Sequence, residues 1–166
     1  LKDGTVVLAT GPMTGWGRKL NFIQRGSGQV VSRSLQVQDG AGLAALPDGG
    51  VAAVGDGKLM LYNADGDLRN PGGAEAQGET LRATPVVVHS RNGREDQWVV
   101  VARGERRLLV VNALGETLFQ ESFWPEGSLG SYLTGLHRLN DGSILVLESS
   151  GRARILDVEG TVDVGR

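Results

Sequence analysis

Short apolar runs that end at turn residues repeat along the whole chain. The segment 43–68, LAALPDGGVAAVGDGKLMLYNADGDL, contains three of them, which end at Asp48-Gly49, at Asp56-Gly57 and at Asp65-Gly66. Asp-Gly and Asn-x-Asp-Gly place glycine where a tight hairpin turn needs a positive φ. This segment therefore predicts three short strands joined by two tight turns.

The same layout recurs with a period of about 45 residues. Asp3, Asp48, Asp96 and Asp141 each precede a β-rich run, at spacings of 45, 48 and 45 residues. A second apolar run follows each of these, and three of the second runs end in Asn or Asp with glycine three residues later: Asn63/Gly66, Asn112/Gly115 and Asp157/Gly160. A self-similar unit of about 45 residues with roughly four strands is the sequence signature of a β-propeller blade.

The prediction is an all-β propeller domain over 1–166, with four blade-like repeats at about 1–40, 41–81, 82–127 and 128–166. The inner strands are expected at 42–46, 85–90 and 132–139, the second strands at 5–9, 51–54, 97–102 and 143–147, and the outer strands near 30–37, 68–70, 117–123 and 161–164. The first blade lacks its inner strand. No helix is expected, and the segment 74–81 is interpreted as a loop. A β-sandwich is the alternative, because strands every 8 to 12 residues or so also fit it.

Two stretches, AGLAALPDGGVAAVGDGKLMLYNADGDL at 41–68 and LHRLNDGSILVLESSGRARILDVEG at 136–160, resemble bacterial propeller repeats of the quinoprotein-like (PQQ-like) and delta-60 types. The resemblance covers most of the chain and implies a propeller. It does not imply quinone chemistry, because the tryptophan-docking motif of quinoprotein blades is absent. It also suggests a bacterial periplasmic, cell-envelope or secreted setting.

Composition narrows the possible partners. With 17 Lys and Arg against 19 Asp and Glu, the chain has a formal charge of -2 and lacks the basic surface of a nucleic-acid binder. It contains no cysteine, which excludes disulfides and thiolate metal sites. No apolar run approaches the roughly 20 residues of a membrane-spanning helix, so membrane insertion is not expected. The missing inner strand is expected to precede Leu1, or to come from the rest of a larger propeller or from a second copy of the chain.

One hairpin departs from the period. The distance from its Asp-Gly to its closing glycine is about 25 residues in the first repeat but 18 or 19 in the others. The roughly six additional residues fall at 11–19, where Trp16 stands beside the cations Arg18 and Lys19. Insertions in repeat proteins gather on binding faces, and Trp and Arg are frequent binding anchors. We interpret Trp16, Arg18 and Lys19 as a candidate binding loop; a neutral surface turn is the alternative.

Histidine offers a second candidate site. The chain has two, His89 and His137, and both fall on predicted inner strands, which line the central channel of a propeller. His137 next to Arg138 can present two donors to an anionic group. A histidine hydrogen-bonded at a strand edge is the alternative. The aromatic residues near the connection between the third and fourth repeats are expected to fill the seam between blades: Phe119, Phe123, Trp124 and Tyr132.

No metal site, cofactor or catalytic residue is predicted. Asn63, Asp65 and Asp67 have the spacing of a calcium loop, but Leu68 and Ala74 stand where such a loop needs glycine and a bidentate acid, so a hairpin turn is expected. The chain contains no Gly-x-Ser-x-Gly elbow. The favoured function is therefore a non-catalytic propeller that presents loops, above all 11–19, to a protein, peptide or glycan. The alternative is a fragment of a larger propeller enzyme, quinoprotein-like or hydrolase, with its active residues outside this chain.

Overall fold

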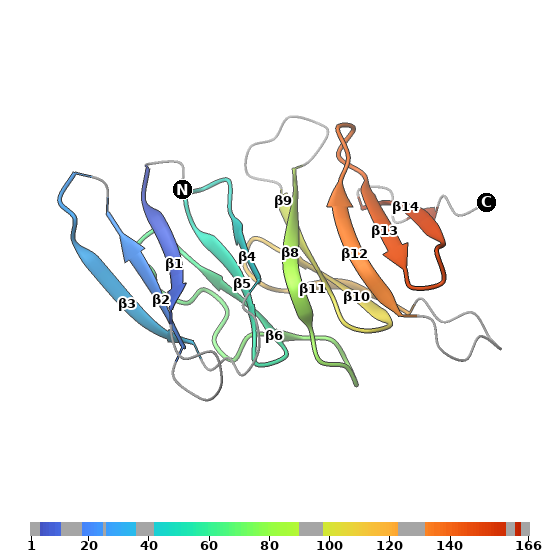
Figure 1. Ribbon diagram of the computed structural model, residues 1–166, viewed down its shortest axis with the longest axis horizontal. Coiled ribbons are helices and arrows are strands. Elements are labelled where there is room, and N and C mark those ends of the chain that lie inside the picture. The colour runs from blue at the N-terminus through green and yellow to red at the C-terminus, as the bar shows by residue number, and fades with distance from the viewer. Residues whose placement is uncertain are drawn as a thin grey trace.

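The computed structural model describes residues 4–10, 18–24, 26–35, 42–89, 98–122, 132–158 and 162–163. These residues form β-strands and no helix, which confirms the all-β class. The strands make four antiparallel sheets, and in each sheet they follow one another in chain order (Figure 1). No helix in this part of the chain has the length and apolar character that crossing a membrane requires.

Each predicted repeat corresponds to one sheet. The first sheet contains β1 (Val6–Thr10), β2 (Arg18–Ile23) and β3 (Val30–Leu35). The second contains β4 (Gly42–Ala45), β5 (Val51–Gly55), β6 (Lys58–Tyr62) and β7 (Ala74–Glu75). The third contains β8 (Arg82–His89), β9 (Trp98–Arg103), β10 (Arg107–Asn112) and β11 (Thr117–Ser122). The fourth contains β12 (Leu133–Arg138), β13 (Ile144–Glu148), β14 (Ala153–Asp157) and β15 (Val162–Asp163).

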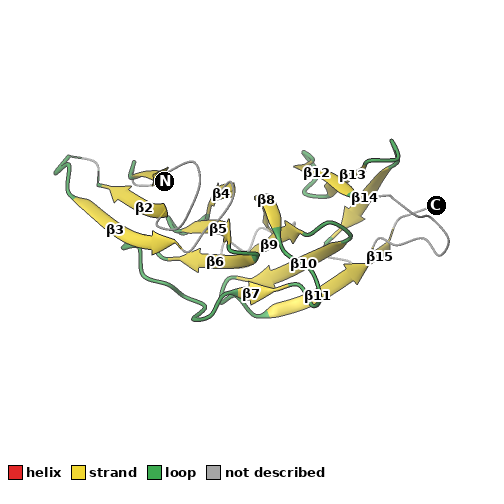
Figure 2. Cartoon of the chain, turned by 60° about the horizontal axis from the view of Figure 1, so that its bottom comes forward, coloured by secondary structure: helices red, strands yellow, loops and turns green. Residues whose placement is uncertain are grey.

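The four sheets stand side by side in an open, bent row (Figures 1 and 2). The first strands β4, β8 and β12 lie on the inner side of the bend, and the last strands lie on the outer side (Figure 2). Four sheets in a row are not the two stacked sheets of a β-sandwich, so that alternative is wrong for the described residues. The row is open, with the first and fourth sheets at its opposite ends (Figure 1).

Equivalent turns identify the strand that the first sheet lacks. A glycine with φ of 85°, 88° or 87° comes two residues before β1, β5 and β13: Gly4, Gly49 and Gly142. Because β5 and β13 are the second strands of their sheets, β1 occupies the second position as well. The first sheet therefore has no counterpart of β4 among the residues that the structure describes, in agreement with the prediction.

The Asn-x-x-Gly turns have the predicted hairpin geometry. In the second sheet the Asn63 N–H donates to the Asp67 carbonyl (2.9 Å) and the Gly66 N–H donates to the Asn63 carbonyl (3.1 Å). The turn at Asn112 and Gly115 repeats both bonds, at 3.0 Å each. The stretch 63–67 is therefore a hairpin turn, and no group of three metal-ligating side chains occurs within the described ranges.

The outer strand of the second sheet is not where the sequence placed it. The prediction was 68–70, but β7 is Ala74–Glu75, and Leu68 makes only an isolated bridge with Tyr62. Between Leu68 and β7, the side chain of Asn70, which is 8% exposed, pairs with β6 in place of a strand. Its Oδ1 accepts from the Leu61 N–H (2.8 Å) and its Nδ2 donates to the Leu59 carbonyl (2.9 Å). A polar side chain thus satisfies two buried backbone groups of β6.

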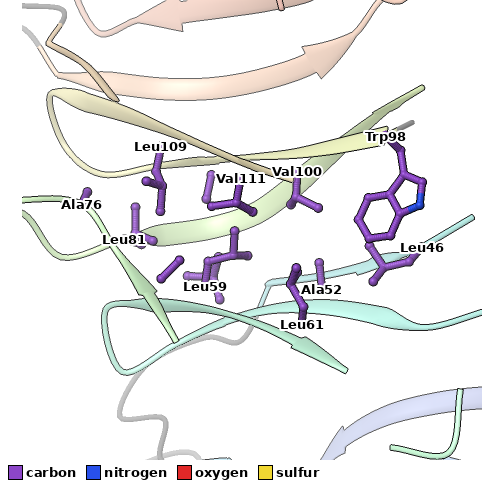
Figure 3. Close-up of a cluster of buried hydrophobic side chains, with 13 residues drawn as sticks. Leu46, Ala52, Leu59, Leu61, Ala76, Leu81, Trp98, Val100, Leu109 and Val111 are labelled. Atoms are coloured by element: carbon purple, nitrogen blue, oxygen red, sulfur yellow. The ribbon is translucent and has the colours of Figure 1, made fainter. Parts of the chain in front are cut away.

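Buried apolar side chains fill the three spaces between consecutive sheets. One cluster joins the first and second sheets, one joins the second and third, and one joins the third and fourth. Figure 3 shows the middle cluster, in which Leu59 and Leu61 face Val100 and Leu109, and Trp98 lies beside Leu46. The second and third sheets are consequently covered on both faces, which explains their nearly continuous apolar runs.

Candidate functional site

The predicted binding loop lies mostly outside the described residues. Trp16 belongs to the segment 11–17, of which the structure describes nothing. Arg18 begins β2 and pairs with Leu35. Lys19 is exposed and pairs with Thr10 of β1. The position of Lys19 agrees with a surface role, and the role of Trp16 stays a prediction.

His137 and Arg138 are both exposed, at the end of β12. His137 pairs with Leu145 and Arg138 pairs with Ile144. Successive side chains of a strand point to opposite faces of the sheet, so the structure does not bring these two donors together on one face. They lie on β12 of the fourth sheet, whereas Lys19 lies on β2 of the first sheet, at the opposite end of the row (Figure 1). The predicted residues therefore do not form one site.

The inner side of the row contains a strained backbone segment. Ala83 has a φ of 65°, and the register of β8 against β9 shifts between Arg82 and Val86, which marks a bulge. A Cβ on Gly42 would lie 2.2 Å from the Ala83 carbonyl oxygen, so β4 and β8 touch through their backbones here. Non-glycine residues at positive φ cost about 1–3 kcal/mol and gather at functional sites. The start of β8 is therefore a candidate site.

Arg103 and Glu105, at the turn between β9 and β10, connect the start of β8 to the start of β12. Arg82 pairs with Arg103 in the sheet and forms an ion pair with Glu105 (3.1 Å). The Arg103 guanidinium donates to the Leu133 carbonyl, and the Leu133 N–H donates to the Glu105 carbonyl (2.6 Å). Burial, with a smaller contribution from nearby Arg82, lowers the pKa of Arg103. Arg103 therefore ties the third sheet to the fourth, while Arg82 stays at the surface.

Polar and aromatic side chains are exposed around this junction. Tyr132, directly before β12, is 54% exposed, and the side chain of Arg82 is 60% exposed. Thr84 and Thr134 are also exposed. Tyr132 was expected to fill the seam between blades, and its exposure shows that this expectation was wrong for Tyr132. We call the exposed residues Arg82, Thr84, Tyr132 and Thr134 the junction site.

The neighbouring hairpin adds positive charge to the junction site. Arg106 and Arg107 lie in and after the turn between β9 and β10, beside Arg103. Glu79 lies in the connection between β7 and β8, and its Oε2 accepts from the Arg106 and Arg107 N–H groups at 2.8 Å and 3.0 Å. The charged run at 103–107, RGERR, is visible in the sequence. The structure adds Arg82 and Tyr132, from distant parts of the chain.

The most buried carboxylate of the described core belongs to Glu148, which is 5% exposed. Its Oε1 lies 3.1 Å from Arg154 Nε, and its Oε2 accepts from the Ser150 hydroxyl at 3.2 Å. Arg154 lies on β14, and Ser150 lies in the turn between β13 and β14. This arrangement is that of an ion pair that holds β13 and β14 together.

Comparison with known proteins gives no family. No protein-family model matches the chain, and no curated protein sequence is similar to it. A crystal structure of a protein from Lactobacillus plantarum is similar over 85% of this chain and 50% of its own, with 15% identity and a TM-score of 0.47. A protein of unknown function from Bacteroides caccae is similar over 96% of this chain and 71% of its own, with 17% identity and a TM-score of 0.41. The chain thus spans half the length of the Lactobacillus protein, and neither comparison supplies a function.

Proposed function

We propose that the four sheets are blades of a β-propeller and that the chain is a non-catalytic binding scaffold for a protein, peptide or glycan. Three features support the blade assignment: the strands of each sheet follow in chain order, the first strands share the inner side of the row, and consecutive sheets pack through apolar faces. An open, bent row of four sheets is what part of a larger ring would form.

The junction site carries the binding proposal. The exposed Arg82 guanidinium already pairs with the Glu105 carboxylate (3.1 Å), and its remaining N–H groups suit a second carboxylate. The Tyr132 ring offers a flat apolar face with a hydroxyl at its tip. The Thr84 hydroxyl can donate or accept a hydrogen bond. The Thr134 hydroxyl already donates to the Leu147 carbonyl (3.2 Å), so it offers a ligand an acceptor. These groups suit a ligand that combines a carboxylate with polar or ring-shaped parts, such as an acidic peptide or an acidic glycan.

The experiment is a screen of the immobilised chain against two probe sets. One is a peptide library with acidic and neutral members, and the other is a glycan array in which sugars with and without a carboxylate are matched. We expect carboxylate-bearing probes to bind. We expect Tyr132→Ala and Arg82→Gln each to weaken the best one about tenfold, or roughly 1.4 kcal/mol.

Leu114→Ala is the matched control, because Leu114 is 66% exposed in the turn after β10 and lies outside the junction site. Binding that is equal in both junction variants and the control would refute this site. Trp16→Ala and His137→Ala, tested on the same probes, show whether the loop or the histidine predicted from sequence takes part. An absence of binding to every probe would contradict the proposed function itself.

A further inference from the structure

The outer faces of the first and fourth sheets are uncovered, and each carries exposed apolar side chains. On the first sheet these lie beside a polar network, in which the Asn21 amide donates to the Thr10 hydroxyl (2.7 Å) and accepts from the Ser32 hydroxyl (2.8 Å). On the first sheet the large exposed side chains are Val6 (52% exposed), Leu8 (46%) and Val30 (54%). They belong to the face opposite Val7 and Phe22, which pack on the second sheet. On the fourth sheet Ile155 is 47% exposed, and Leu145 and Leu147 are half-buried beside it. Every other sheet face among the described residues is covered by a neighbouring sheet.

Equivalent positions in the other sheets indicate what the outer face of the first sheet would contact. Val6, Val51 and Ile144 each come two residues after the equivalent turn glycine. Val51 is 3% exposed and Ile144 is 0% exposed, because each packs against the preceding sheet. Val6 occupies the same position, and no sheet precedes its own within the part of the chain that the structure describes. The outer face of the first sheet is therefore a face that receives a preceding sheet.

The fourth sheet has the complementary face. Ile155, Leu61 and Val110 each come two residues before the equivalent turn residue, Asp157, Asn63 or Asn112. Leu61 and Val110 are both 0% exposed, because each packs against the following sheet. No sheet follows that of Ile155 among the described residues. The two ends of the row thus carry the two halves of an interface that the chain already makes three times.

We infer that a second copy of this chain covers these faces, with the fourth sheet of one copy packed on the first sheet of the other. The occupant is a second copy because this one chain carries both complementary halves, each with exposed aliphatic side chains at positions that are buried in the internal interfaces. Two such head-to-tail contacts would close two rows of four sheets into one ring. The inference rests on the proposed propeller arrangement.

The first measurement is the mass in solution by light scattering during size-exclusion chromatography. We expect twice the chain mass of 17.5 kDa for the wild-type protein. Leu8→Asp and Ile155→Asp each place a charge in one half of the interface, at positions that are already half-exposed within a single copy. Each should give the mass of one copy with an unchanged circular dichroism spectrum. Leu114→Asp is the exposed control and should keep the wild-type mass.

Mixing the two variants tests the head-to-tail geometry. A Leu8→Asp copy keeps an intact fourth sheet and an Ile155→Asp copy keeps an intact first sheet, so an equimolar mixture should regain the two-copy mass. A wild-type protein that has the mass of one copy at every concentration overturns the inference. So does an Ile155→Asp variant that pairs with itself. If one-copy protein still binds the carboxylate probes, the proposed function stands while this inference fails.

Discussion

Replacement of Asn70 by alanine tests whether a side chain substitutes for a strand in the second sheet. The amide of Asn70 accepts from the Leu61 N–H at 2.8 Å and donates to the Leu59 carbonyl at 2.9 Å. Leu59 and Leu61 are both 0% exposed. In the Asn70→Ala variant two backbone groups of the buried strand β6 lose their partners.

The expected loss of stability follows from those two groups. A buried donor or acceptor left without a partner costs about 1–3 kcal/mol, which gives roughly 2–6 kcal/mol for both. Because Asn70 is itself 8% exposed, water can reach part of the site, and we expect a value of about 3 kcal/mol. For a chain of 166 residues this corresponds to a fall in Tm of roughly 6–12 °C.

The measurement is urea unfolding followed by far-ultraviolet circular dichroism, with thermal unfolding alongside it. Asn63→Ala is the matched control, because the Asn63 Oδ1 accepts one bond, from the Asp67 N–H, in an exposed turn where water replaces it. This control should lose no more than about 1 kcal/mol. Equal losses for the two variants, with equal m-values, would refute the claim that the Asn70 side chain completes the sheet.

Three further substitutions test other contacts. Gly42→Ala places a Cβ 2.2 Å from the backbone of Ala83, so we expect the free energy of unfolding in the same urea assay to fall by about 2–3 kcal/mol. A fall below about 1 kcal/mol would contradict the close approach of β4 and β8. Glu79→Ala removes the acceptor of two N–H groups in the next sheet, and about 1–2 kcal/mol of stability should be lost, whereas Glu79→Gln keeps an acceptor oxygen and should lose less. Burial raises the pKa of Tyr62 above its ordinary value of 10.0, so the folded state favours the neutral phenol. The stability that this shift contributes is fully present below about pH 10 and is lost as the pH rises through the raised pKa. Between neutral and strongly alkaline pH, the free energy of unfolding of Tyr62→Phe should therefore fall less than that of the wild type. Parallel plots of unfolding free energy against pH for the two proteins would contradict this.

Local chemistry made much of the fold predictable. The turns at Asp48-Gly49 and Asn112-Gly115 need glycine at positive φ, and they bound strands that the structure places within a residue or two of the prediction. The outer strand at 68–70 was wrong because the Asn70 amide competes with backbone pairing, which no propensity reveals. Such competition between a side chain and a strand depends on which backbone N–H and carbonyl groups of the neighbouring strand are unpaired.

The candidate site was less predictable than the fold. His137 and Arg138 were paired because they are adjacent in sequence, although the two-residue period of a strand separates their side chains. The sequence could not predict the junction site, because Arg82 and Tyr132 are fifty residues apart and are brought near each other by the contacts of Arg103 and Glu105. The run of charges at 103–107 is visible in the sequence, but it indicates a site only once the structure places β8 and β12 next to it.

Equivalent positions in different repeats differ in exposure according to the sheets that flank them. A valine at the same position after the same turn is 3% exposed in the second sheet and 52% exposed in the first. The difference cannot come from Val6 itself, since its counterparts Val51 and Ile144 are also aliphatic, so it comes from the absent neighbour. In a row of repeats each sheet is stabilised by the two that flank it, and the end sheets have only one. The exposure of Val6 and Ile155 therefore belongs to a surface that further packing would stabilise, whereas Tyr132 and Arg82 lie where the described sheets already meet.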